Sequence, residues 1–251
     1  MRPPDKLVFS RARVRQRYAL FPLEGYPPSR IPNWRGCDVR VLASPALGAG
    51  FAQYLIDLPN GNEQGYDHAF TQEFGYVLSG SVHISTEGEK RELGPGGYFY
   101  VPEMGQYELR AEAASRILLL RKRFEKSGVY GTNDPCHIIG DAANVPSAPF
   151  ADNPHTRLQL LIPDEVDYDF AMNIFTFDPG HGLPYVETHV MEHGLLMLEG
   201  KGMYYLDGEW MEVEKDDFIW MGPYCPQSFY ATGTQPVKYL YYKNVNREIA
   251  L

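Results

Sequence analysis

The sequence predicts an all-β protein built from two similar β domains, and three observations carry this prediction. The chain of 251 residues contains 24 Gly and 20 Pro, and 14% of its residues are aromatic, a composition typical of short strands separated by turns. One long segment recurs at a fixed distance along the chain. No segment has the sustained apolar period of a long amphipathic helix, so we expect only short, peripheral helices.

The recurring segment gives the order of elements in each domain. EFGYVLSGSVHISTEGEKRELGPGGYFYVPE begins at Glu73 and HGLLMLEGKGMYYLDGEWMEVEKDDFIWMGP begins at His193, an ungapped offset of 120 residues that sets Gly80 against Gly200. Each copy reads as a strand, a Gly turn, an alternating strand, a second Gly turn, a strand and a Pro/Gly turn. The repeat is too long for a solenoid unit and indicates a duplicated β domain.

The repeat also divides the chain. We expect the first domain in residues 1–125 and the second in residues 159–251. The stretch 126–158 is rich in Pro, Asn, Asp, Gly and Ala, which is typical of a connection between domains.

Composition and charge limit the classes of partner. The formal net charge of −9 argues against nucleic acid or an anionic membrane as the main partner. No hydrophobic stretch approaches the length of a membrane span, and the N-terminal sequence lacks the apolar core of a signal peptide, so we expect a cytoplasmic protein. Cys37, Cys136 and Cys225 are odd in number and far apart, which favours reduced thiols over a disulfide framework.

The second copy carries a group of potential metal ligands. Glu187 and His189 are two residues apart, so on a strand both side chains leave the same face. His193 precedes Gly194, where the chain can turn and return a third ligand, and Gln227 follows later. Imidazole and carboxylate donors without thiolate suit Mn²⁺, Fe²⁺, Zn²⁺ or Ni²⁺. The alternative, an amphipathic helix with both imidazoles on a solvated face, is disfavoured by the neighbouring β-branched residues and glycines.

The first copy lacks such a group. At the same offset it has Asp67, Ala69, Glu73 and Tyr107. Ala69 cannot ligate a metal and no histidine remains in the set, so we expect a metal-free domain. We further expect this domain to serve packing between subunits in a closed homo-oligomer.

These residues give the chain a resemblance to bicupins, which have two antiparallel jelly-roll barrels and a first motif of the form H-x-H-x(3,4)-E-x(6)-G. Glu187 and His189 stand in the H-x-H positions, His193 in the Glu position, and Gly200 at the closing glycine, while Gln227 stands at the histidine of the second motif. The Glu-His-His-Gln set, together with YVETHVMEHG, is similar to that of the (S)-ureidoglycine aminohydrolase family. The likeness covers nearly the whole chain. Departures from the generic second motif are Asp216, Gly222 and Tyr224.

The resemblance implies one Mn²⁺ ion per chain and hydrolysis of (S)-ureidoglycine to (S)-ureidoglycolate and ammonia in purine breakdown. The metal ligands that it implies are Glu187, His189, His193 and Gln227. The residues that it implies for substrate binding and catalysis are Glu187, Tyr204, Tyr239 and Lys243, with Gln227 also contacting the substrate. The ammonium of Lys243 offers an anchor for the substrate carboxylate, and the tyrosine hydroxyls can donate hydrogen bonds. The alternative is a solvated strand-end lysine beside ordinary core tyrosines.

Two other functions stay open at this level. A cupin metal-dependent dioxygenase would use three histidines and one glutamate, a set from which Gln227 departs. A non-enzymatic bicupin that binds a small molecule is the second alternative, but it gives the ligand set and Lys243 no obvious purpose. Fold alone does not decide among the three.

Overall fold

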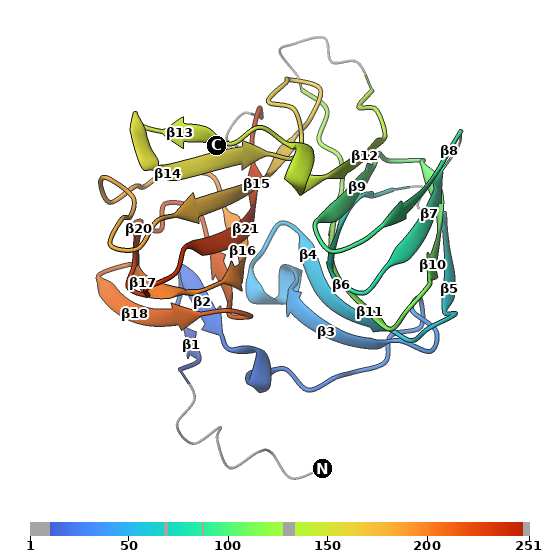
Figure 1. Cartoon of the computed structure of the whole chain (residues 1–251), viewed down its shortest axis with the longest axis horizontal. Coiled ribbons are helices and arrows are strands. Elements are labelled where there is room, and N and C mark those ends of the chain that lie inside the picture. The colour runs from blue at the N-terminus through green and yellow to red at the C-terminus, as the bar shows by residue number, and fades with distance from the viewer. Residues whose placement is uncertain (1–10, 68–69, 87, 128–133, 248–251) are drawn as a thin grey trace.

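Two β barrels lie side by side in the computed structural model, which describes residues 11–67, 70–86, 88–127 and 134–247 (Figure 1). The predicted two-domain all-β architecture is confirmed. Helical structure within these ranges is limited to single 3-10 turns: η2 (Leu23–Gly25), η3 (Pro45–Leu47) and η4 (Ala142–Asn144). None of the described helices is long and apolar enough to cross a membrane.

The first barrel consists of a six-stranded sheet, in the order β12-β9-β6-β11-β4-β3, and a four-stranded sheet, in the order β5-β10-β7-β8. All of its pairings are antiparallel. The bounds are β3 (Asp38–Ala43), β4 (Ala52–Leu58), β5 (Glu63–Asp67), β6 (Gln72–Ser79), β7 (Val82–Thr86), β8 (Glu89–Leu93), β9 (Gly97–Val101), β10 (Gln106–Ala111), β11 (Ser115–Lys122) and β12 (Ile138–Asp141).

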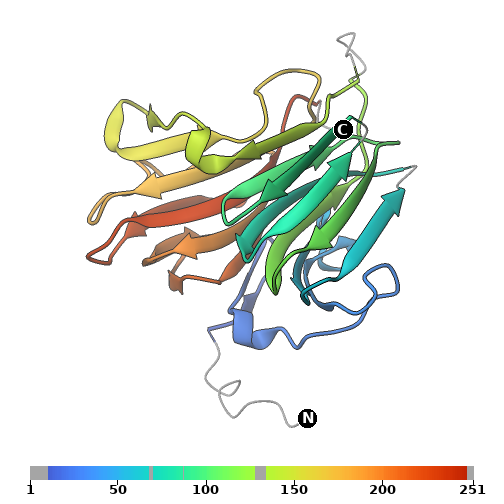
Figure 2. The same ribbon diagram turned by 45° about the vertical axis from the view of Figure 1, so that its right-hand side comes forward.

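The second barrel repeats this plan with an eight-stranded sheet, in the order β1-β2-β19-β16-β21-β15-β14-β13, and a three-stranded sheet, in the order β18-β17-β20. Figure 2 shows its yellow-to-red strands beside the cyan-to-green strands of the first barrel. The bounds are β1 (Arg13–Val14), β2 (Tyr18–Phe21), β13 (Ala148–Phe150), β14 (Asn153–Leu160), β15 (Phe170–Phe177), β16 (His193–Glu199), β17 (Lys201–Leu206), β18 (Glu209–Glu214), β19 (Phe218–Met221), β20 (Gln227–Ala231) and β21 (Val237–Asn244).

The strand pairings cross the division that the sequence suggested. β2 pairs with β19 of the second barrel, with Tyr18 opposite Met221, although it precedes the whole first barrel. β12 and β13 both lie in the expected connection 126–158, yet β12 pairs with the first barrel and β13 with the second. An exposed sheet edge is a site for unwanted pairing, and these segments cover such edges. Each barrel therefore depends on residues outside its own repeat.

The burial of each strand face depends on what packs against it. In β10 buried and exposed residues alternate strictly, because one face of that strand meets the core and the other meets water. β6 is buried along most of its length, because its sheet packs on both sides. One core cluster spans both barrels and joins Phe51, Tyr98 and Tyr100 of the first to Phe170 and Tyr242 of the second. The two barrels therefore share a continuous apolar layer.

A buried ion pair crosses this layer. The Lys122 ammonium lies 2.6 Å from the Asp169 carboxylate, and their side chains are 3% and 0% exposed. Asp169 also accepts hydrogen bonds from the Gln72 amide, at 2.6 Å, and from the backbone N–H of Glu125, at 2.9 Å. The Tyr100 hydroxyl donates to the Gln72 side-chain oxygen at 2.7 Å. Each buried polar group here has a partner, which is the condition under which buried charge is tolerated.

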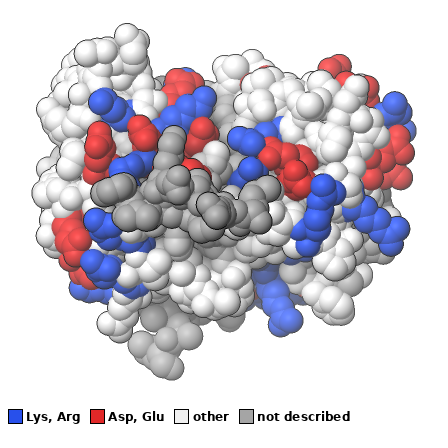
Figure 3. All heavy atoms as spheres, turned by 90° about the horizontal axis from the view of Figure 1, so that it is seen from below, with Lys and Arg blue, Asp and Glu red and all other residues white. Residues whose placement is uncertain are grey.

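Charges on the surface are mixed. On the face drawn in Figure 3, Lys and Arg side chains lie next to Asp and Glu side chains. Arg17 with Asp207, and Arg15 with Glu209, are pairs of this kind.

Removal of the buried carboxylate should destabilise the fold strongly. Asp169→Ala leaves the buried Lys122 ammonium with only the exposed Glu125 carboxylate, at 2.7 Å, and the Arg123 carbonyl, at 3.2 Å, as partners. We therefore expect the free energy of unfolding to fall by about 3 kcal/mol, at the lower end of the cost of breaking a buried ion pair. Urea denaturation measures this change. The control is Glu199→Ala, which breaks the exposed pair between Lys238 and Glu199 and should change stability by less than about 1 kcal/mol. Equal effects of the two substitutions would contradict the prediction.

Candidate metal centre and active site

All seven predicted site residues line one cavity of about 80 Å³ inside the second barrel. They come from a loop and from strands β16, β17, β20 and β21, which are distant in sequence. The residues are Glu187, His189, His193, Tyr204, Gln227, Tyr239 and Lys243. Tyr241 also lines the cavity, as do Phe150 and Phe175 on the apolar wall.

Glu187 and Gln227 are fixed together through their backbones. They form an isolated antiparallel bridge, in which the N–H of each residue donates to the carbonyl of the other, at 2.8 and 2.9 Å. Residues 187–189 do not form the strand that the sequence predicted. The structure therefore corrects that expectation: Glu187 is placed by this bridge, and His189 is placed by the N–H of Tyr224, which donates to its carbonyl at 2.7 Å.

His193 is the first residue of β16, so the predicted turn at Gly194 is also wrong. The chain bends at Val190 instead and then enters the strand. β16 lies between β19 and β21, and His193 stands opposite Met221 on one side and opposite Lys243 on the other. The bend, together with the strand, brings the His193 ring back to that of His189, with ring centroids 5.0 Å apart.

The two imidazoles present lone pairs to each other. Nδ1 of His189 lies 3.1 Å from the carbonyl of Met191, and Nδ1 of His193 lies 3.0 Å from the carbonyl of Tyr242. A carbonyl only accepts hydrogen bonds, so both Nδ1 atoms carry the proton. Both Nε2 atoms are then lone-pair donors, and they face each other at 3.2 Å. Such a pair fits a cation held between the rings.

Burial keeps these rings neutral. It lowers the pKa of His193 to about 3, and it lowers the pKa of His189 as well. Neutral imidazole is the form that binds metals. In the described part of the chain, no three His, Cys, Asp or Glu side chains form a preassembled metal cluster. The potential donors that line the cavity are the two imidazoles, the Gln227 amide and the Glu187 carboxylate.

The remaining polar groups surround the imidazoles. The Gln227 amide nitrogen lies 3.3 Å from Nε2 of His189, and its oxygen accepts from the Tyr204 hydroxyl at 3.2 Å. Burial lowers the pKa of Lys243, and the nearby Glu187 carboxylate opposes that shift. Burial likewise raises the pKa of Glu187, against the effect of Lys243. The strand face that was predicted to carry Tyr239 and Lys243 into the barrel is the face that lines the cavity.

The first barrel fills the same place with an ion pair. Glu73 stands opposite Arg121 in β6 and β11, as His193 stands opposite Lys243 in β16 and β21. The Arg121 guanidinium donates to the Glu73 carboxylate, which also accepts from the Tyr107 hydroxyl at 2.6 Å. Ala69 and the side chain of Asp67, which complete the sequence-based set, lie outside the described residues.

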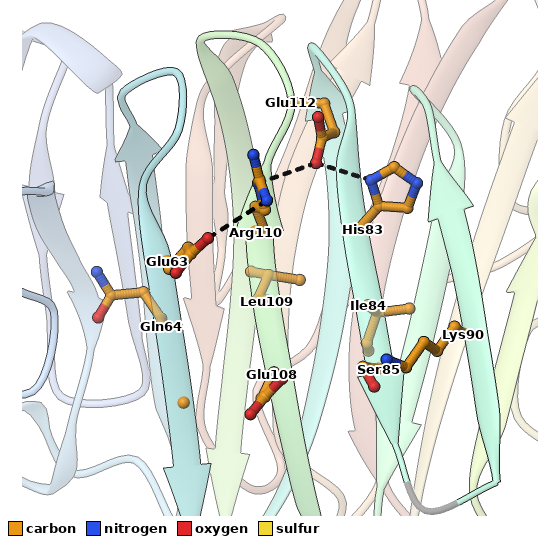
Figure 4. Close-up of a pocket in the computed structure, with 11 residues that line it drawn as sticks. Glu63, Gln64, His83, Ile84, Ser85, Lys90, Glu108, Leu109, Arg110 and Glu112 are labelled. Carbon is orange, nitrogen blue, oxygen red and sulfur yellow. Dashed lines mark ion pairs between the residues drawn. The ribbon is translucent and has the colours of Figure 1, made fainter.

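A larger hollow, of about 600 Å³, lies on the first barrel (Figure 4). Its charged side chains pair with one another: His83 lies 2.8 Å from Glu112, and Arg110 lies 3.3 Å from Glu112 and 3.5 Å from Glu63. These side chains are between 32% and 69% exposed, so water screens them. The smaller, buried cavity is the better candidate site. The homo-oligomer expected of this barrel stays a prediction.

Sequence reasoning missed part of the lining. The Tyr241 hydroxyl accepts a hydrogen bond from the Asn173 side-chain amide at 3.3 Å. The two-residue spacing in the sequence already sets Tyr241 on the strand face of Tyr239 and Lys243 but gives it no role, whereas Asn173 lies on β15 and no local pattern marks it. Cys225 is a buried free thiol in the second core, and the two other cysteines are also free.

Comparison with known proteins agrees with this architecture. The cupin domain model matches the chain twice, over residues 54–120 and 173–242. The (S)-ureidoglycine aminohydrolase of Escherichia coli is 34% identical, over 98% of this chain and 96% of that protein. The one from Arabidopsis thaliana is 31% identical, over 95% and 79%. The crystal structure of protein Ylba from E. coli superposes with a TM-score of 0.86, at 32% identity over 99% of each chain.

The two cupin matches, and the identity over nearly the full length, show the family of the chain. The chain belongs to the cupin family and, within it, to the (S)-ureidoglycine aminohydrolase family.

Proposed function

We propose that this protein is a Mn²⁺-dependent (S)-ureidoglycine aminohydrolase, which converts (S)-ureidoglycine and water to (S)-ureidoglycolate and ammonia. The observation that carries the proposal is the pair of buried, neutral imidazoles of His189 and His193, with their Nε2 atoms facing each other at 3.2 Å. Family membership supports the reaction. Imidazole, carboxylate and amide donors without thiolate support a metal of the Mn²⁺ class.

The cavity suits a small, polar substrate. Ureidoglycine carries a carboxylate, an amine and a ureido group on one carbon, and the cavity of about 80 Å³ is lined by ammonium, carboxylate, amide and hydroxyl groups. The Lys243 ammonium can bind the carboxylate. Burial raises the pKa of Tyr204 and of Tyr239, so both hydroxyls stay protonated and can donate to the carboxylate or to the ureido oxygen. These contacts fix the faces of the reacting carbon.

Hydrolysis also requires proton transfer. The attacking water must lose a proton and the departing amine must gain one. Glu187 is the carboxylate in the cavity and the candidate carrier of that proton. A divalent ion held by Glu187, His189, His193 and Gln227 would supply positive charge that orients the substrate and stabilises developing negative charge. Phe150 and Phe175 form the apolar wall, which limits the entry of further water.

One ion per chain is expected on elemental analysis after loading with Mn²⁺ and dialysis. The His189→Ala/His193→Ala variant should retain none, because it lacks both imidazole donors. The control is His155→Ala/His181→Ala, which removes the other close imidazole pair, stacked with centroids 4.1 Å apart and outside the cavity. This control should keep its ion. Two ions in the wild type, or one in the first variant, would overturn the metal site.

Lys243→Met tests the substrate anchor. Loss of a charge-assisted hydrogen bond costs about 1.5–3 kcal/mol, so kcat/KM for ammonia release from freshly generated (S)-ureidoglycine should fall about tenfold to a hundredfold. The Mn²⁺ content should not change, because lysine is not a ligand.

Lys238→Met is the matched control. Lys238 lies on the same strand, β21, but pairs with Glu199 at the surface, so kcat/KM should stay within about twofold of the wild type. An unaltered kcat/KM in Lys243→Met would remove the lysine from the mechanism. No turnover of ureidoglycine by the Mn²⁺-loaded wild type would reject the proposed function and favour a binding protein or a dioxygenase.

A further inference from the structure

A contact between the barrels lies directly behind the metal centre. Glu192 belongs to the segment that carries His189 and His193, and it is 7% exposed. Its carboxylate does not line the cavity but lies against Gly50, in the loop between β3 and β4 of the first barrel. Figure 1 shows β3 and β4 on the side of the first barrel that faces the second.

Four hydrogen bonds hold Glu192. The N–H of Gly50 donates to both carboxylate oxygens, at 3.0 and 3.1 Å, and the indole N–H of Trp220 donates at 3.3 Å. The backbone N–H of Glu192 itself donates to the Asn244 side-chain oxygen at 2.7 Å. The carboxylate thus has two donors, Gly50 and Trp220, and the Glu192 backbone has its own partner in Asn244, so both the side chain and the backbone of this residue are held in place.

Gly50 permits this close approach. A Cβ atom at this position would lie 2.6 Å from Oε1 of Glu192, closer than non-bonded atoms can approach. With any larger residue at this position, the Glu192 carboxylate would have to move away from its present place against the N–H.

The loop between β3 and β4 also contacts the surroundings of His193. The Phe51 ring packs on the Tyr242 ring, with centroids 4.3 Å apart. The carbonyl of Tyr242 is the acceptor for Nδ1 of His193. A Cβ atom on Gly194 would lie 2.6 Å from the Phe51 ring, so the backbone next to His193 also touches the first barrel. Gly50 and Phe51 thus contact the residues on either side of His193 in the sequence, which are Glu192 and Gly194.

We propose that Glu192 is a positioning residue, through which the first barrel holds His189 and His193 in the geometry that binds the metal. The metal part of this inference rests on the proposed function. Outer contacts that orient ligands commonly change metal affinity by about 10–100-fold. The first barrel, which lacks the ligand set, thereby sets the affinity of the site in the second.

Gly50→Ala tests the inference from the side of the first barrel, without a change to any proposed ligand. The new methyl group displaces the Glu192 carboxylate. We expect faster amide hydrogen exchange in residues 187–193 of the metal-free protein, because local opening becomes easier. We also expect the Kd for Mn²⁺ to rise about tenfold or more, measured by calorimetric titration well below the unfolding temperature.

Two further variants separate positioning from general damage. Gly94→Ala adds the same methyl group to the first barrel where nothing lies within 4 Å, and it should leave both measurements unchanged. Gly50→Ala/Glu192→Asp shortens the carboxylate side chain to make room for the methyl group, and it should recover at least half of the lost affinity. If Gly50→Ala does not fold, Trp220→Phe replaces it as the test, because it removes one donor to Glu192 without adding bulk. Trp220→Phe should then also give faster exchange in residues 187–193 and a higher Kd for Mn²⁺.

The outcomes are distinguishable. The inference is wrong if Gly50→Ala leaves the exchange in residues 187–193 unchanged, whether or not metal binds. The same result for Trp220→Phe decides the matter if Gly50→Ala does not fold. Faster exchange with an unchanged Kd for Mn²⁺ would reduce Glu192 to a structural contact and overturn it too. A wild type that binds no Mn²⁺ would reject the proposed function, whereas the hydrogen exchange would still test whether Glu192 holds the segment.

Discussion

The antiparallel register between β16 and β21 is the constraint on which the site depends. It sets His193 directly opposite Lys243, while the pairing with β19 on the other side keeps β16 in the middle of the sheet. Because side chains alternate between the two faces of a strand, a slip of β21 by one residue against β16 would turn Lys243 out of the cavity. His189 in the loop, and Gln227 on the facing three-stranded sheet, come close to His193 because the barrel closes around this central strand.

The same register serves a different chemistry in the first barrel. There Glu73 faces Arg121, and the two opposite charges neutralise each other with Tyr107 as a further partner. A closed ion pair satisfies its own polar groups and leaves no lone pair for a metal. In the second barrel two neutral imidazoles replace that arrangement and leave lone pairs that a cation can use. The duplicated barrels therefore share their geometry and differ in whether the central polar groups already have partners. The hydrogen bond from Gly50 to Glu192 connects the first barrel, whose central charges are paired, to the segment beside His193 in the second.

Sequence patterns predicted the all-β class, the duplication and the group of residues at the site, because period-two alternation, Gly turns and an ungapped repeat are local signals. They failed at residues 187–189 and at His193, where a bridge to a distant strand and a bend override local preference. They also could not show that Arg121 is the counterpart of Lys243, two residues away from the constant offset. The irregularities of the two pairings fall at equivalent places, beside Leu78 and Leu198, and do not cause this difference. It arises because the loop from Ala231 to Val237 is two residues longer than the loop from Ala111 to Ser115. The role of Glu192 depends on how the barrels approach each other, for which the repeat gives no signal.

Anomalous diffraction at the manganese absorption edge, from crystals grown with Mn²⁺, tests most directly whether the second barrel holds a metal ion. We expect one anomalous peak per chain, within coordination distance of Nε2 of both His189 and His193, and none beside Glu73 and Arg121. A peak only at the surface, a second peak in the first barrel, or the absence of any peak in the second barrel would contradict the claim that its register builds the metal centre.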